Sequence, residues 1–335
     1  MPIIAGSPRD KEYIAVASCV GKTPLYEIRN IEIPNGCRIF CKEEYLNPTG
    51  SHYDRFWVPY LRHLENTNRI SIEHTLIETS TGNSGASFAW ACRALGFQDY
   101  RVVIPEDMPY TRISQIQELG AKIELSEAGR YVEGLIEKFA SYVDDVRSKS
   151  QRPVSIPNHS RYGTVSLNSL AMIVDEVMAD LPKGYRSVSR LDYFVTALGN
   201  GLSTKGMGER LKNRFPAIKL IGIEAAQSPT IYTERTKTTP PPTTGKTHGL
   251  LGTSPGMNST VFPIMHEYAT NLTDVNLIEE TDWNEAGIKL ANFEGKFVGH
   301  TSAASFHQAM QIAKKVSNKN ILIVFYDPAW KYMKK

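Results

Sequence analysis

The residues best suited to do chemistry lie in three polar loops that contain glycine. The first, residues 47–55, reads NPTGSHYDR and is called the tyrosine loop here. It places the imidazole of His52 next to the phenol of Tyr53, and either group can move a proton. Neighbouring residues at a helix start point about 100° apart, so we expect only one of the two to line a cleft.

The other two loops are suited to hold anions. Residues 80–84 (STGNS, the carboxylate loop) and 199–203 (GNGLS, the anion loop) each stand between an expected strand and an expected helix. Free N–H groups at a helix start attract a carboxylate, and glycine lets the backbone approach it closely. A single loop of this kind is an ordinary turn about as often as it is a binding site. The candidate binding residues are Ser80, Thr81, Gly82, Asn83, Ser84, Gly199, Asn200, Gly201, Leu202 and Ser203.

The loops are positioned by short apolar runs that alternate with amphipathic stretches. This alternation predicts an α/β fold in which helices cover both faces of a parallel sheet. Ligands of such sheets bind where strands hand over to helices. The predicted strands are 38–42, 75–79, 101–105, 122–125, 192–197, 219–224 and 320–325.

Three helical stripes and one long loop complete the pattern. Apolar residues recur at helical spacing within 88–95, 132–146 and 167–181, and we interpret these stripes as core faces without a functional role. Residues 227–247 are rich in Thr and Pro and predict a long loop, of the kind that covers a site or faces a partner.

Composition excludes several classes of function. Lys and Arg number 38 against 35 Asp and Glu, so there is no charge footprint for nucleic acid or for a membrane surface. No apolar run approaches the ~20 residues that span a bilayer, and the N-terminus lacks a signal pattern. We therefore expect a cytoplasmic protein with reduced thiols. The four cysteines and eight histidines lack metal-site spacing, and no metal is expected.

Taken together and in order, the motifs resemble those of the fold type II pyridoxal-phosphate enzymes, such as cysteine synthase, cystathionine β-synthase, threonine dehydratase and the tryptophan synthase β subunit. GKTPL at 21–25 is similar to the family's G-x-T-P-L, and the carboxylate loop is similar to its substrate-carboxylate loop. In that loop Asn83 matches the asparagine that bonds the cofactor's ring hydroxyl. The anion loop falls on the phosphate-binding G-T-G-G-T, and 294–302 resembles E-G-x-x-x-G-x-S.

The resemblance implies an architecture and further site residues. It implies two open twisted sheets covered by helices, with a smaller domain at 47–155 and a larger one at 1–46 plus 156–335. It also implies a homodimer, a carboxylated small molecule as ligand, and Asn158, Ser302 and Pro328 as further residues of the cleft.

Two departures bear on the cofactor. The family's first loop reads N-P-x-G-S-x-K-D-R, and its lysine holds pyridoxal phosphate as an imine, but this chain has Tyr53 there. Pro328 stands where relatives place a hydroxyl for the pyridine nitrogen. The resemblance thus implies pyridoxal phosphate, but not as an imine at the usual position, and the identity of any cofactor stays open. Tyr53 is a filler of vacated space or a general acid, and the alignment favours it over His52 as the residue in the cleft.

Three hypotheses of function remain. In the first, the protein is an unconventional lyase or transferase that acts on an amino-acid-like or carboxylated molecule without pyridoxal phosphate. In the second, it is a catalytically silent relative that binds a metabolite or a partner. In the third, pyridoxal phosphate binds noncovalently or through another lysine such as Lys205.

Overall fold

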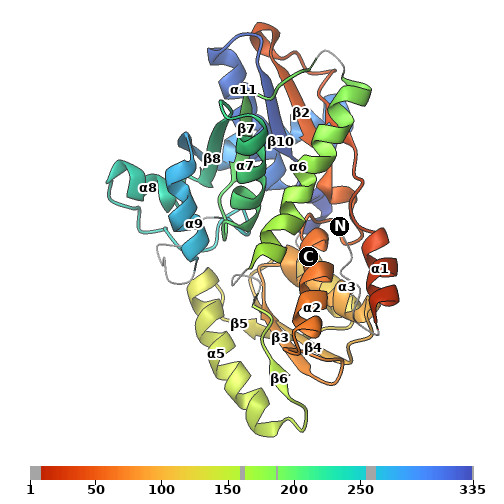
Figure 1. Ribbon diagram of the computed structural model, residues 1–335. Coiled ribbons are helices and arrows are strands. Elements are labelled where there is room, and N and C mark those ends of the chain that lie inside the picture. The colour runs from red at the N-terminus through yellow and green to blue at the C-terminus, as the bar shows by residue number, and fades with distance from the viewer. Residues whose placement is uncertain (1–8, 159–162, 186–187, 254–261, 334–335) are drawn as a thin grey trace.

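A computed structural model describes residues 9–158, 163–185, 188–253 and 262–333 of the chain. It contains two mainly parallel sheets flanked by helices, which confirms the predicted α/β architecture (Figure 1). The smaller sheet lies within 75–155, while the division of the chain into domains stays a prediction. Within these ranges no helix is both long enough and apolar enough to cross a membrane.

The larger sheet has six strands, and only its edge pair β1–β2 is antiparallel. Alternate residues of its strand β10 enter different cores: Ile321 and Ile323 pack with α11, whereas Leu322 and Val324 pack with α6 and α7. This period of two is what a strand covered on both faces requires. The strand order is β1 (Leu25–Glu27), β2 (Arg38–Lys42), β10 (Asn320–Val324), β7 (Tyr193–Ala197), β8 (Lys219–Ala225) and β9 (Asp274–Ile278).

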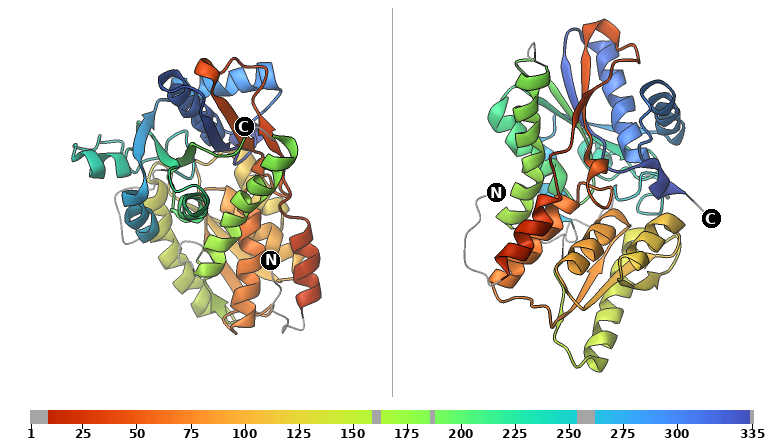
Figure 2. Two further views of the ribbon diagram at one scale, coloured as in Figure 1. Left: turned by 45° about the horizontal axis from the view of Figure 1, so that its top comes forward. Right: turned by 90° about the vertical axis from the view of Figure 1, so that its right-hand side faces the viewer.

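The smaller sheet has four parallel strands and is covered in the same way. Leu76 and Val102 face the core that contains α2 and α3, while Ile77 and Val103 face α5. Figure 2 shows α1 alongside α2, outside this sheet. The strand order is β5 (Lys122–Ser126), β4 (Asp99–Pro105), β3 (Thr75–Thr79) and β6 (Val154–Ser155).

The helices place the polar loops at the carboxyl ends of the strands. The carboxylate loop joins β3 to α3, and the anion loop joins β7 to α7. The α-helices are α1 (Asp10–Ser18), α2 (Asp54–Asn66), α3 (Asn83–Ala94), α4 (Tyr110–Glu118), α5 (Tyr131–Lys149), α6 (Thr164–Gly184), α7 (Leu202–Arg214), α8 (Ile231–Thr236), α9 (Pro263–Tyr268), α10 (Glu280–Lys289) and α11 (His300–Lys315).

The structure corrects the sequence-based elements in two places. Strands β1, β6 and β9 were not predicted, because the first two are only three and two residues long and β9 interleaves polar side chains. The predicted loop at 227–247 contains the short helix α8. This helix begins where the buried Glu224 carboxylate accepts the N–H groups of Thr230, Ile231 and Tyr232.

Candidate functional site

A cavity of about 420 Å³ lies where the tyrosine, carboxylate and anion loops meet. Both His52 and Tyr53 line it, so the expectation that only one of them would do so was wrong. Both residues precede α2, which begins at Asp54, and their rings lie 4.4 Å apart, on the same side of the chain. From the three loops, the lining residues are His52, Tyr53, Ser80, Thr81, Asn83, Ser84, Gly199, Asn200, Gly201 and Ser203.

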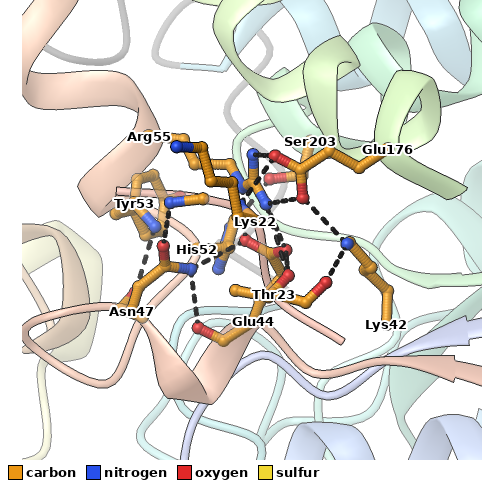
Figure 3. Close-up of polar contacts among 12 residues, drawn as sticks. Lys22, Thr23, Lys42, Glu44, Asn47, His52, Tyr53, Arg55, Glu176 and Ser203 are labelled. Atoms are coloured by element: carbon orange, nitrogen blue, oxygen red, sulfur yellow. Dashed lines mark hydrogen bonds and ion pairs between the residues drawn. The ribbon is translucent and has the colours of Figure 1, made fainter. Parts of the chain in front are cut away.

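A buried ionic network fixes the tyrosine loop (Figure 3). The guanidinium of Arg55 donates to both Glu44 oxygens, at 2.6 and 2.8 Å, and to both Glu176 oxygens, at 2.8 and 2.7 Å. Lys42 Nζ lies 2.8 Å from the same Glu176 carboxylate, and Asn47 donates to Glu44 at 2.9 Å. The network therefore joins the start of α2 to β2 and α6, which holds His52 and Tyr53 in place.

The charged groups in this network favour one another's ionised forms. Burial alone would raise the pKa of the Glu44 carboxyl, but the Arg55 guanidinium lowers it below its ordinary value. The pKa of Glu176 falls to about 2, because the hydrogen bonds from Arg55 and Lys42 outweigh its burial. Both carboxylates stay ionised at neutral pH, so Arg55 keeps two anionic partners.

Two proton-carrying groups meet at one wall of the cavity. His52 Nε2 lies 2.9 Å from the Ser203 hydroxyl, and the His52 and Tyr53 rings are 4.4 Å apart. Burial lowers the pKa of His52 to about 4, so its ring is neutral at pH 7. Burial raises the pKa of Tyr53 to about 12, against a hydrogen bond with Asn200, so its hydroxyl keeps its proton.

The carboxylate loop would bind an anion mainly through backbone N–H groups, because the Ser80 hydroxyl is engaged within the loop. Ser80 Oγ accepts the N–H groups of Gly82 and Gly85, at 2.9 and 2.7 Å, and thereby shapes the loop. Asn83 and Ser84 begin α3, where backbone N–H groups have no acceptor within the helix. Thr81, Asn83 and Ser84 line the cavity, so the N–H groups of this helix start can hold a small anion there.

Below this loop lies a polar cluster that the sequence patterns did not indicate, here called the Asp327 cluster. Asp327 accepts from Asn83 at 2.7 Å and from Arg112 at 3.0 Å. Lys331 Nζ donates to Asn83 at 3.0 Å, and the Tyr332 hydroxyl also bonds to Asp327. Arg112 comes from α4, which carries no recognisable motif, so no sequence signal pointed to it. Asn83 thus already has protein partners at both ends of its amide.

Four predicted site residues do not line the cavity. Gly82 lies against Arg112: its φ is 131°, and a Cβ there would stand 2.4 Å from the Arg112 side chain. Leu202 is fully buried in the core, and Ser302 accepts the Tyr326 N–H at 2.8 Å. Pro328 packs against the backbone at Gly50 instead. Asn158, in contrast, does line the cavity.

The cavity does not fit a pyridoxal phosphate that is bound through an imine. Imine formation needs a primary amine, and no lysine stands among the described residues that line the cavity. Lys205 lies on α7 away from the lining, and the amine of Lys331 is engaged by Asn83. Within the described ranges, no group of three or more His, Cys, Asp or Glu residues could hold a metal ion.

Comparison with known proteins gives one consistent result. The family described as "Pyridoxal-phosphate dependent enzyme" matches residues 16–327. Cysteine synthase B of Campylobacter jejuni is 25% identical, covering 96% of this chain and 98% of that protein. A hydrogen sulfide-producing enzyme from Fusobacterium nucleatum superposes with a TM-score of 0.80 at 24% identity, covering 95% and 99% of the two chains. An O-acetylserine-dependent cystathionine β-synthase from Helicobacter pylori superposes with a TM-score of 0.79 at 23% identity, covering 99% of this chain and 98% of that chain.

Proposed function

The chain belongs to the pyridoxal-phosphate dependent enzyme family, and within this family we propose that it is an unconventional lyase or transferase. It acts on a carboxylated small molecule without pyridoxal phosphate. The pairing of His52 and Tyr53 beside the Ser203 hydroxyl, in one cavity with the carboxylate loop, carries this proposal. The cofactor departures at Tyr53 and Pro328 support it.

The two rings supply opposite halves of a proton transfer. A neutral imidazole accepts a proton and a protonated phenol donates one, and environments that push two pKa values apart mark such acid–base pairs. The substrate carboxylate binds the N–H groups that begin α3. His52 then takes a proton from the substrate, and Tyr53 donates its proton to the departing group.

Turnover by the isolated chain tests this proposal. A panel of amino acids, 2-oxo acids and 2-hydroxy acids is screened by proton NMR, and the converted compound is then used with Tyr53→Phe and His52→Gln. We expect each variant to lose 10²–10⁴-fold in kcat/KM, the usual contribution of an acid or base. Tyr110→Phe, at a half-exposed tyrosine outside the cavity, is the matched control. Undiminished turnover by Tyr53→Phe would remove Tyr53 from the mechanism.

The pH profile gives a second readout of the same pair. With the pKa of His52 at about 4 and that of Tyr53 at about 12, kcat/KM is expected to stay level between those values. A fall around pH 6.5 would mean that the histidine is not depressed in this way. Such a profile would contradict the role of a buried, neutral His52.

A silent binding protein is the second candidate. The Asp327 cluster favours it, because Asn83, Arg112 and Asp327 satisfy one another without any ligand. Turnover of any compound by the homogeneous chain would count against it.

Binding of pyridoxal phosphate is tested separately. The protein is mixed with the cofactor and reduced with borohydride, and its peptides are analysed by mass spectrometry. A modified Lys205 or Lys331 would support the hypothesis of a lysine-bound cofactor. A chromophore without a modified lysine would indicate noncovalent binding.

A further inference from the structure

One apolar part of the cavity wall comes from α5. The sequence predicts the stripe on this helix as a core face, and the structure adds that part of the stripe also lines the cavity. Its C-terminal part, Val143 and Val146, packs against Ile77 and Val103. Its N-terminal part also lines the cavity, through Val132, Leu135, Ile136 and Phe139, although Leu135 belongs to the same core.

Val132 and Leu135 of this apolar wall are buried, and its exposed part among the described residues is formed by Ile136 and Phe139. The Ile136 side chain is 38% exposed, and Phe139 is partly exposed. Leu251 and Phe262 line the same cavity from other segments. Removing apolar surface from water yields about 25 cal/mol per Å², so a ligand with an apolar group gains affinity by covering this wall.

The wall is held in place at the first residue of α5. The Tyr131 hydroxyl accepts the Gly252 N–H at 2.8 Å and lies 3.4 Å from the Thr253 carbonyl oxygen. Gly252 and Thr253 also line the cavity, and Tyr131 is fully buried. The helix start is therefore tied to the segment that lines the cavity beside it.

The cavity combines this wall with an anion site. Residues of the carboxylate loop and apolar residues of α5 line the same cavity. Cavities of about 300–1,000 Å³ bury most of a small organic ligand, and this one is about 420 Å³. A ligand as small as a three-carbon acid that occupies the loop leaves the α5 face exposed to water.

We infer that the ligand of this cavity is a carboxylic acid whose other end is an aryl or branched alkyl group seated against α5. The inference rests on the proposed function for the carboxylate site and adds the substrate class. Val132, Leu135, Ile136 and Phe139 are then the residues that determine specificity.

Calorimetric titration of the full chain with propionate and 3-phenylpropionate tests the inference. Both acids present the same carboxylate, and only one carries an aryl group. Each buried methylene tightens binding roughly fourfold, so the aryl acid is expected to bind at least about tenfold more tightly. Ile136→Ser should reduce that ratio severalfold and leave propionate binding unchanged. Ile288→Ser, at an isoleucine that is 62% exposed outside the cavity, should leave the ratio as it is.

A second pair guards against a folding defect in the first. Phe139→Ala should also reduce the ratio, and Phe293→Ala, at a phenylalanine that is 58% exposed and is not among the residues lining the cavity, should not. Equal affinity of the two acids for the native protein would overturn the inference and leave the proposed proton transfer standing. Tight binding of the aryl acid by a protein that turns over no compound would support the inference and contradict the proposed proton transfer. Failure of both acids to bind would refute the carboxylate site and the inference with it.

Discussion

Lys331 should make the stability of the protein depend on pH in the alkaline range. Its amine is fully buried, and burial lowers its pKa from 10.5 to about 8, although Asp327 partly opposes this effect. Between pH 8 and 10.5 the unfolded chain binds more protons at this residue than the folded chain. The free energy of unfolding therefore rises with pH over that window, by about 3 kcal/mol in total at roughly 1.4 kcal/mol per pH unit.

The variant Lys331→Met isolates this contribution. Urea unfolding is measured for the native protein and the variant at pH 7 and at pH 9. The native protein should gain roughly 1 kcal/mol more than the variant between the two conditions. Lys183→Met, at an exposed lysine at the end of α6, should behave like the native protein. The same change for native protein and Lys331→Met would refute the reasoning, because the buried amine would then titrate as it does in the unfolded chain.

Three further outcomes are expected. Arg55→Met should lower the free energy of unfolding by about 3–5 kcal/mol, because Glu44 then stays buried without its cation, and a chemical denaturation curve checks this. Gly206→Ala should cost about 1–3 kcal/mol in thermal unfolding, since its Cβ would stand 2.7 Å from the Leu167 carbonyl oxygen where α7 meets α6. Gly184→Ala, where a Cβ meets nothing within 4 Å, is the control and should leave the stability in thermal unfolding unchanged. Light scattering on a sizing column should give the mass of a homodimer, and a monomer would contradict the expectation from the resemblance.

Much of the fold follows from short-range pattern. β2 and β3 have the predicted bounds, because each is a short run of mostly apolar or β-branched residues between turn-forming segments, which indicates a buried strand from local sequence alone. The carboxylate and anion loops stand at the predicted strand-to-helix junctions for the same reason. Glycine positions also carry local information: Gly201 has a φ of 91°, which few other residues adopt.

Contacts between segments that are distant in sequence assemble the site. His52 and Ser203 are far apart in sequence and meet only because α2 and α7 start at the same cavity. Arg112 reaches Asp327 from α4, and no local pattern can indicate an ion pair between such distant segments.

The stripe on α5 illustrates the limit most directly. Spacing shows that one face of a helix is apolar, but it does not say what covers that face. Val143 packs against the smaller sheet, whereas Ile136 lines a cavity, and both belong to one amphipathic helix. The sequence by itself therefore determined most of the strands, the three polar loops and the proton-carrying side chains, because these depend on neighbours along the chain. Only the tertiary structure decided which of them face a common cavity, because that depends on contacts between segments that the chain order does not encode.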